Sequence, residues 1–155
     1  MKSIKFLLAF VLFAGISVSC SDDDDNPNPT GGTLEGRWIP TETVVKSGNN
    51  EIVNDYTGHQ PGCDKDYIEF AAGNVFNKVD YNPDINNPSI CAPSSAAPAS
   101  YTRAENSLTI GGNTTYAGTY TITRLTNSQM RLSSSASTGA AGVTTILYFD
   151  RASSN

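Results

Sequence analysis

The sequence is poor in the residues from which metal and catalytic sites are usually built. Among 155 residues there is one histidine, His59, which stands in a loop of glycine and proline, and the three cysteines form no Cys-x-x-Cys pair. No serine occupies a Gly-x-Ser-x-Gly elbow, and Gly111-Gly112 lacks the strand–loop–helix setting of a phosphate site. Zinc binding and nucleophilic catalysis need several such groups together. We therefore expect a protein that is not an enzyme and that uses no metal and no cofactor.

Positive charge is scarce as well. Ten lysines and arginines face fifteen acidic residues, the formal net charge is −5, and no cluster of basic side chains occurs along the chain. Binding to a phosphate backbone requires such a cluster, so nucleic acid is not an expected partner. Peripheral attraction to anionic lipid is not expected, for the same reason.

Only the N-terminus contains a long apolar run. Lys2 and Lys5 give residues 1–19 a positive start, and residues 4–18 are apolar almost without interruption. The run is shorter than the roughly 20 residues that a membrane-spanning helix needs, and it ends in small residues. We predict an export signal peptide over residues 1–19. Ser17-x-Ser19 also fits the cleavage site of an ordinary secreted protein, so that alternative stays open at this point.

Cys20 stands directly behind this segment and favours a lipid anchor. A cysteine after a small residue resembles the lipobox of bacterial lipoproteins, in which the cysteine is freed by cleavage and acylated, although Ser17 stands where leucine is commonest. The four aspartates 22–25 resemble the export tag of surface lipoproteins in Bacteroidota. The resemblance implies a lipoprotein held in the outer membrane or at the cell surface by acyl chains on Cys20, palmitate among them. Two or more acyl chains are enough for stable anchoring.

The composition changes behind this cysteine. Residues 20–33 are mainly aspartate, asparagine, proline, threonine and glycine, which cannot form a packed core, so we predict a solvated tether. Residues 34–151 have the length of a single domain. If Cys20 is acylated, Cys63 and Cys91 remain, and in an exported protein such a pair is most simply a disulfide. The chain-entropy model credits the loop that it closes with about 3.5 kcal/mol.

The sequence of this domain predicts β-structure throughout. Threonine, valine, isoleucine and tyrosine are plentiful, and apolar residues nowhere recur at helical spacing for three turns. Pro40 within the first strand predicts an edge or a bulge. We expect loops at residues 46–58, 82–99 and 133–142. About eight short strands are predicted, over residues 36–45, 66–70, 75–81, 100–104, 108–110, 114–125, 129–132 and 143–151, which describes an antiparallel barrel or sandwich.

Several segments resemble lipocalins. Leu34-Glu35-Gly36-Arg37-Trp38 resembles their Gly-x-Trp opening. Cys63-Asp64-Lys65-Asp66-Tyr67-Ile68-Glu69-Phe70, followed by Gly73-Asn74-Val75-Phe76, resembles the centre of the lipocalin-like domains carried by Bacteroidota lipoproteins. Asn106-Ser107-Leu108-Thr109-Ile110 and Tyr120-Thr121-Ile122 continue the resemblance. It implies an all-β fold, a small antiparallel up-and-down β-barrel of about eight short strands, in a family whose members mostly have no established ligand.

The resemblance also assigns roles to aromatic residues. Trp38 would close one end of the barrel with Arg124 or Arg151 stacked on its ring, and an ordinary core position is the alternative. Tyrosine is a good strand former, which explains the tyrosines of the predicted strands without a ligand. The candidate ligand-binding residues are Trp38, Tyr67, Tyr101, Tyr116, Tyr120 and Tyr148.

Two functions from different classes remain. In the first, the domain binds a small apolar or amphipathic molecule in its barrel, which requires an interior pocket above about 300 Å³. In the second, the barrel is filled, and the domain is an adhesion, inhibitor or complex-subunit module that contacts an unknown protein partner through outer loops, residues 82–99 in particular.

Two acidic patterns have structural interpretations. Asp80-x-Asn82-x-Asp84-x-Asn86 has the oxygen spacing of a calcium loop, but Ile85 and Cys91 stand where that loop needs glycine and glutamate. We therefore expect a polar turn. Asp64 and Asp66 alternate onto the strand face opposite Glu69, so no shared acid–base site is expected.

Overall fold

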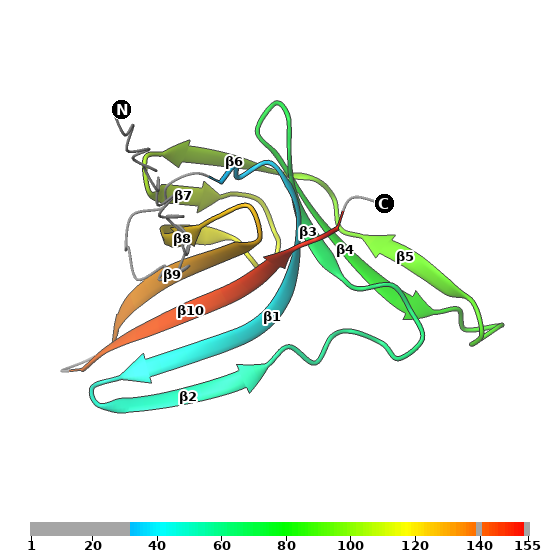
Figure 1. The fold of residues 1–155 in the computed structure, drawn as a ribbon, viewed down its shortest axis with the longest axis horizontal. Helices are drawn as coiled ribbons and strands as arrows, with labels where there is room; N and C mark the ends of the chain where they lie inside the picture. Colours follow the sequence, from blue (N-terminus) through cyan, green and yellow to red (C-terminus); the bar gives the residue numbers. More distant parts are fainter. Residues whose placement is uncertain (1–31, 139–140, 154–155) are drawn as a thin grey trace, which may run out of the picture.

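A computed structural model describes residues 32–138 and 141–153, and every regular element in them is a β-strand (Figure 1). The predicted signal peptide, Cys20 and residues 20–31 of the predicted tether lie outside these residues. No helix in the described part of the chain is long and apolar enough to span a membrane. The strands are β1 (Gly36–Ser47), β2 (Asn50–Asp55), β3 (Tyr67–Ala71), β4 (Val75–Pro83), β5 (Cys91–Ser95), β6 (Ala99–Ala104), β7 (Ser107–Ile110), β8 (Gly118–Leu125), β9 (Gln129–Thr138) and β10 (Ala141–Arg151).

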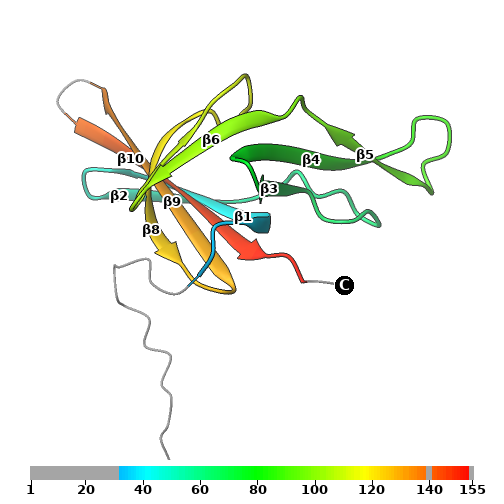
Figure 2. The same cartoon turned by 90° about the horizontal axis from the view of Figure 1, so that it is seen from above.

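Eight of these strands close into an antiparallel barrel. Neighbouring strands follow the order β1-β3-β4-β6-β7-β8-β9-β10, and β10 pairs again with β1. β2 lies beside β1 and β5 beside β4, outside this circuit, and β5 extends away from the barrel, as Figures 1 and 2 show. The prediction of a small antiparallel up-and-down β-barrel is confirmed.

β1 changes its partner half-way along. Residues 36–38 pair with β3, whereas residues 42–47 pair with β2. The register between β1 and β10 shifts between Pro40 and Glu42. Proline has no N–H to donate to a ladder, so an irregular pairing at this place fits its chemistry and confirms the expectation drawn from Pro40.

β4 divides in the same way. Val75 and Phe76 pair with β6, while residues 79–83 pair with β5. β2 therefore pairs with the part of β1 that lies beyond β3, and β5 pairs with the part of β4 that lies beyond β6. We call these two places the branches of the barrel. Residues 56–66 connect β2 to β3 at the first of these branches, and we call them the connecting segment.

The prediction of loops was wrong in three places. β2 lies in the expected loop 46–58, β5 in the expected loop 82–99, and the serine- and threonine-rich ends of β9 and β10 pair with each other across residues 133–142. β2 escaped prediction because its apolar residues, Ile52 and Val53, are adjacent and show no alternation. β5 contains Pro93, which an edge strand tolerates.

Other boundaries follow turn chemistry. The predicted turn between β3 and β4 is confirmed, with Gly73 and Asn74 in the left-handed region at φ 76° and 61°. The predicted strand 114–125 begins only at Gly118, so Tyr116 belongs to the connection between β7 and β8.

Candidate functional site

Side chains fill the centre of the barrel. The Phe70 ring lies 5.4 Å from Phe76 and 5.0 Å from Tyr101 between centroids, edge-on in both cases. Tyr116 lies 6.1 Å from Phe76 and 6.0 Å from Phe149. Such pairs stabilise a core beyond the area that they bury. The core cluster consists of Leu34, Trp38, Ile68, Phe70, Phe76, Tyr101, Leu108, Ile110, Tyr120, Ile122, Leu125, Met130, Leu132 and Phe149.

Tyr116 enters this core as a neutral phenol. Burial raises the pKa of its hydroxyl well above the ordinary value, and Asp80, Tyr120 and Asp66 act in the same direction. The Tyr120 hydroxyl donates to the carbonyl oxygen of Tyr116 at 3.0 Å. This bond holds the β7–β8 connection over the barrel.

Trp38 closes one end of the barrel together with Arg151. The buried indole donates its Nε1–H to the carbonyl oxygen of Leu34 at 2.8 Å. The Arg151 guanidinium lies over the indole, with Cζ 4.2 Å from the ring centroid, and donates to the carbonyl oxygens of Glu35 and Thr33. A cation is attracted by the negative face of the indole. An arginine is thus stacked on Trp38, as the resemblance implies, and the indole also belongs to the core cluster, which was the alternative.

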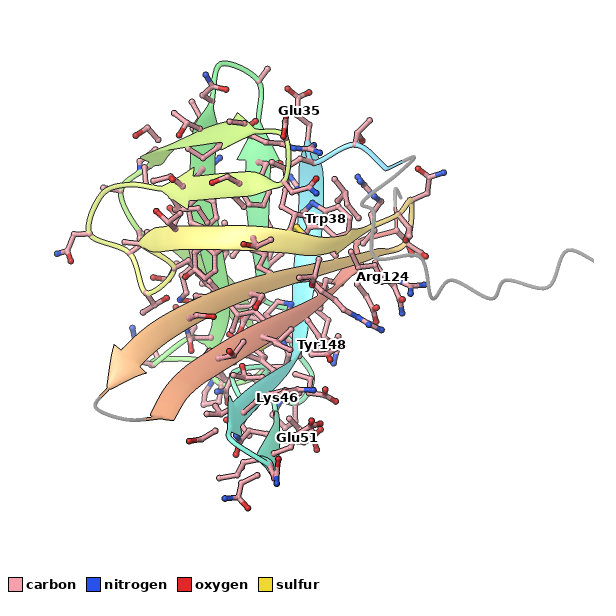
Figure 3. The ribbon with its side chains drawn as sticks, turned by 90° about the vertical axis from the view of Figure 1, so that its left-hand side faces the viewer. Glu35, Trp38, Lys46, Glu51, Arg124 and Tyr148 are labelled. Atoms are coloured by element: carbon pink, nitrogen blue, oxygen red, sulfur yellow. A yellow bond between two sulfur atoms is a disulfide. The ribbon has the colours of Figure 1, made fainter. Side chains whose placement is uncertain are left out.

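Gly36 leaves room for this arrangement. Its φ of +123° is a conformation that other residues rarely adopt, and a Cβ atom there would lie 2.6 Å from Nη1 of Arg151. Arg151, one of the two arginines named from the sequence, is stacked on Trp38. Arg124 lies on β8, opposite Arg131 of β9, and it is labelled in Figure 3.

A pocket of about 400 Å³ lies where β1 passes from β3 to β2, and we call it the branch pocket. Residues of β1 and β10 form one side of it, and the connecting segment forms the other. Its size falls in the range of small-molecule sites. The lining residues are Ile39, Pro40, Thr41, Tyr56, His59, Lys65 and Asp150.

Asp66 fastens the connecting segment on two sides. The residue is only 3% exposed, and its Oδ2 accepts the Tyr56 hydroxyl at 3.0 Å while its Oδ1 accepts the N–H of Tyr81 at 2.7 Å. One carboxylate therefore joins the end of β2 to β4. Burial and the bond to Asp66 raise the pKa of Tyr56, which keeps the phenol as the donor in this pair.

His59 is bound through both ring nitrogens. Nδ1 accepts the N–H of Asp66 at 3.1 Å, and Nε2 lies 3.1 Å from the carbonyl oxygen of Pro40. Because a carbonyl oxygen only accepts, these contacts assign the neutral tautomer with its proton on Nε2. The Tyr56 ring packs against the imidazole at 4.7 Å. His59 thus serves as a fixed wall of the pocket.

The Cys63–Cys91 disulfide provides a third fastening. Its Cα atoms are 5.5 Å apart, and it joins the connecting segment to the first residue of β5. The predicted pairing is confirmed. With the contacts of Asp66 and His59 it fastens the connecting segment, which forms one side of the branch pocket.

A second pocket of about 410 Å³ lies at the end of the barrel where the described chain begins. Arg151 holds the backbone of its N-terminal wall through the carbonyl oxygens of Thr33 and Glu35. Its lining residues are Gly32, Thr33, Leu34, Glu35, Asn74, Tyr101 and Arg103.

Acidic residues near β4 form a turn, as expected. Oδ1 of Asp84 accepts the N–H groups of Asn86 and Asn87 at 2.7 and 3.1 Å, which is an ordinary aspartate turn. Across residues 32–138 and 141–153, no three side chains of histidine, cysteine, aspartate or glutamate gather as metal ligands would.

The family comparison agrees with this architecture. A family model described as a lipocalin-like domain matches residues 34–132, which is well over half of the chain. The chain belongs to the lipocalin-like domain family. A comparison with curated proteins gave no match.

The part of this lipocalin-like domain that closes the barrel lies beyond the matched residues. The match begins at Leu34, whose carbonyl oxygen binds the Trp38 indole, and it ends within β9. β10 and Arg151 follow it. The contact of Arg151 with Trp38 therefore joins a matched residue to an unmatched one.

The six candidate ligand-binding residues do not line one cavity of the lipocalin-like domain. Trp38, Tyr101 and Tyr120 belong to the core cluster, and Tyr116 packs against it. Tyr67 lies outside the core beneath Arg37, whose Cζ is 4.7 Å from the ring, and Tyr148 lies beneath Arg131 at 4.9 Å. Tyr101 alone among the six borders a described pocket. Their role in ligand binding stays a prediction.

Sequence reasoning missed the residues that form the branch pocket. Tyr56 falls in the expected loop 46–58, His59 in a loop of glycine and proline, and Asp150 near the end of the predicted strand 143–151. The signal that pointed toward them was indirect: the only histidine, His59, lies four residues before Cys63.

Proposed function

We propose that this chain is a lipid-anchored surface protein whose lipocalin-like domain binds a small amphipathic molecule in the branch pocket. The proposal rests on the branch pocket, which has the volume of a small-molecule site. The centre of the barrel, by contrast, holds the core cluster of side chains. The binding site thus differs from the interior cavity expected from the sequence.

The walls of the branch pocket suit a molecule with an apolar body and an anionic head. Ile39 and Pro40 supply apolar surface, and Tyr56 and His59 supply ring edges. Lys65 is exposed and forms no ion pair with any described residue, the Asp150 carboxylate of the same pocket included, so its ammonium group is available to an anion. A few polar groups on a mostly apolar wall are typical of ligand sites.

Preorganisation supports affinity in this pocket. Asp66, His59 and the Cys63–Cys91 disulfide already order the connecting segment. A ligand would not have to supply that ordering free energy.

The binding proposal is tested with 1-anilinonaphthalene-8-sulfonate, which has an aromatic body and one sulfonate. We expect saturable one-to-one binding by calorimetry to the full-length chain carrying Cys20→Ala. Ile39→Trp, which fills the branch pocket, should weaken binding at least tenfold. Glu35→Trp places the same ring in the second pocket and should leave it unchanged. Binding that survives Ile39→Trp and is lost in Glu35→Trp would overturn the choice of pocket.

The anchoring proposal rests on residues 1–25 of the sequence. Cells expressing the unaltered chain should carry it in the membrane fraction, accessible to added protease, and Cys20→Ala should release it into the soluble fraction. A Cys20→Ala chain that stays with the membrane would show that the lipid assignment is wrong.

A second candidate function, a protein-contact module, is favoured by one observation. The hairpin between β4 and β5 presents Ile85, which is 94% exposed, and Ile90, which is 56% exposed. The Asp84 turn and the disulfide at the base of β5 hold this hairpin in shape. Ile85→Asp should abolish retention of a protein partner from the native cell surface, and Asn87→Asp should not.

A further inference from the structure

The outer edge of β2 is unpaired within the described residues. β2 pairs with β1 alone, and all six of its residues are exposed. Ile52 and Val53, which point to opposite faces, are 60% and 53% exposed. Natural edge strands are usually protected by proline, lysine or a bulge. β5, the other strand outside the barrel circuit, contains Pro93, whereas β2 has no proline, lysine or bulge, and its only charged side chains are Glu51 and Asp55.

The backbone of β2 is oriented for further pairing. The two-residue turn Gly48-Asn49 makes Ser47 and Asn50 a hydrogen-bonded pair, so even-numbered residues of β2 face β1. The bond from the N–H of Tyr56 to the carbonyl oxygen of Thr41, 2.8 Å, continues this series. Glu51, Val53 and Asp55 therefore direct their N–H and C=O groups to the open edge.

We propose that two copies of this chain associate through β2, antiparallel and edge to edge, with Ile52 of one copy opposite Ile52 of the other. The inference goes beyond the proposed function and does not depend on it, because the open edge of β2 is not part of the branch pocket.

Symmetry restricts the register of this pairing. A two-fold axis between antiparallel edge strands stands perpendicular to the sheet, so opposed residues must point to the same face and must both be odd or both be even. Each register is then centred on one residue, which lies opposite the same residue of the second copy. Only centres at Ile52 and Val53 keep five opposed positions within β2.

Charge decides between these two centres. The Val53 centre opposes Glu51 to Asp55 at both ends, and like charges directly opposite each other destabilise a sheet. The Ile52 centre opposes Glu51 to Val53 and Asn50 to Asn54, with no acid facing an acid. Glu51 keeps its own ion pair with Lys46 at 2.7 Å, at the far end of the β1–β2 hairpin in Figure 3. The Ile52 register is therefore the one proposed.

The contact is small, so we expect weak association that depends on concentration. Cysteine crosslinking tests the register in the full-length chain carrying Cys20→Ala. Opposed residues of a non-hydrogen-bonded pair have Cα atoms about 4.5 Å apart, within disulfide reach, while diagonal neighbours lie beyond it. Ile52→Cys should give at least tenfold more covalent dimer under mild oxidation than Val53→Cys. Ser94→Cys on β5 is the matched edge control and should give none.

A second variant tests the association without a thiol. Val53→Pro removes an N–H that points to the open edge and leaves the β1 ladder intact, so sedimentation should show a monomer at concentrations where the parent chain dimerises. Trp38 emission checks that the barrel remains folded. Equal crosslinking through Val53→Cys, or a parent chain that is monomeric at every concentration, would overturn the proposal.

Discussion

Arg151 is the residue on which the closed end of the barrel most depends. It covers the Trp38 ring and donates to two backbone carbonyl oxygens. Arg151→Met removes the cation and these donors together, so we expect the free energy of unfolding to fall by about 2 kcal/mol. Urea unfolding followed by the emission of Trp38, the only tryptophan, measures it. Arg131→Met, which uncovers the outer Tyr148, should cost about 0.5 kcal/mol. Equal losses would contradict a special role for Arg151.

Asp66 accepts hydrogen bonds from the Tyr56 hydroxyl and from the Tyr81 N–H. Asp66→Asn keeps one oxygen acceptor and turns the other into a donor, so both charge-assisted bonds become neutral ones and the Tyr56 hydroxyl must change from donor to acceptor. We expect a loss of roughly 2 kcal/mol in the free energy of unfolding. Exposed Asp64, two residues earlier, is the matched control, and Asp64→Asn should stay within about 0.5 kcal/mol.

At this scale the sequence predicted contacts that follow a motif and missed those that follow topology. The Gly-x-Trp opening pointed to Trp38 and to a stacked arginine. Nothing local in the sequence connects Asp66 to the N–H of Tyr81, because the bond exists only once β3 and β4 have paired. Strand alternation placed Asp66 on a face but could not show that the face was covered.

The connecting segment behaves as one element because the disulfide joins it to β5. Replacing both cysteines, Cys63→Ser with Cys91→Ser, should lower the free energy of unfolding by about 3.5 kcal/mol. It should also weaken binding of the naphthalene sulfonate, since the wall formed by His59 loses a support. Urea unfolding and calorimetry on the same samples measure both effects. Cys20→Ser is the matched control, and a comparable loss there would contradict this assignment.

Elements with strict alternation were predictable, and elements without it were not. β3 and β4 were found within two residues of their ends because Ile68 and Phe70 alternate with polar residues and a left-handed turn follows. β2 and β5 have no buried face, so burial left no pattern in their sequences. β2 is held instead by its pairing with β1 and by the tight turn between them. β5 is held by its pairing with β4 and by the disulfide at Cys91.

For the whole molecule, the fold was predictable and the pocket was not. A barrel follows from eight alternating segments separated by short turns. The branch pocket arises between residues as distant as Ile39 and Asp150, and it depends on the two strands that lie outside the barrel circuit. A sequence contains no periodic signal for such a junction. The filled centre likewise depends on Tyr116, which reaches the core from a connection and not from a strand.

The buried phenols make the whole barrel sensitive to alkaline pH. Burial raises the pKa of Tyr56, Tyr101, Tyr116 and Tyr120 in the folded protein, whereas an unfolded tyrosine titrates near pH 10. Below about pH 10 these groups are neutral in both states, and their contribution to stability is fully present. Above it the unfolded chain loses protons first, so the free energy of unfolding should fall steadily as pH rises. Urea unfolding at several pH values, with tyrosinate absorbance, measures this. Tyr116→Phe should flatten the decline more than Tyr67→Phe, because Arg37 partly offsets the effect of burial on the pKa of Tyr67. An unchanged slope in Tyr116→Phe would show that this ring is not a neutral part of the core.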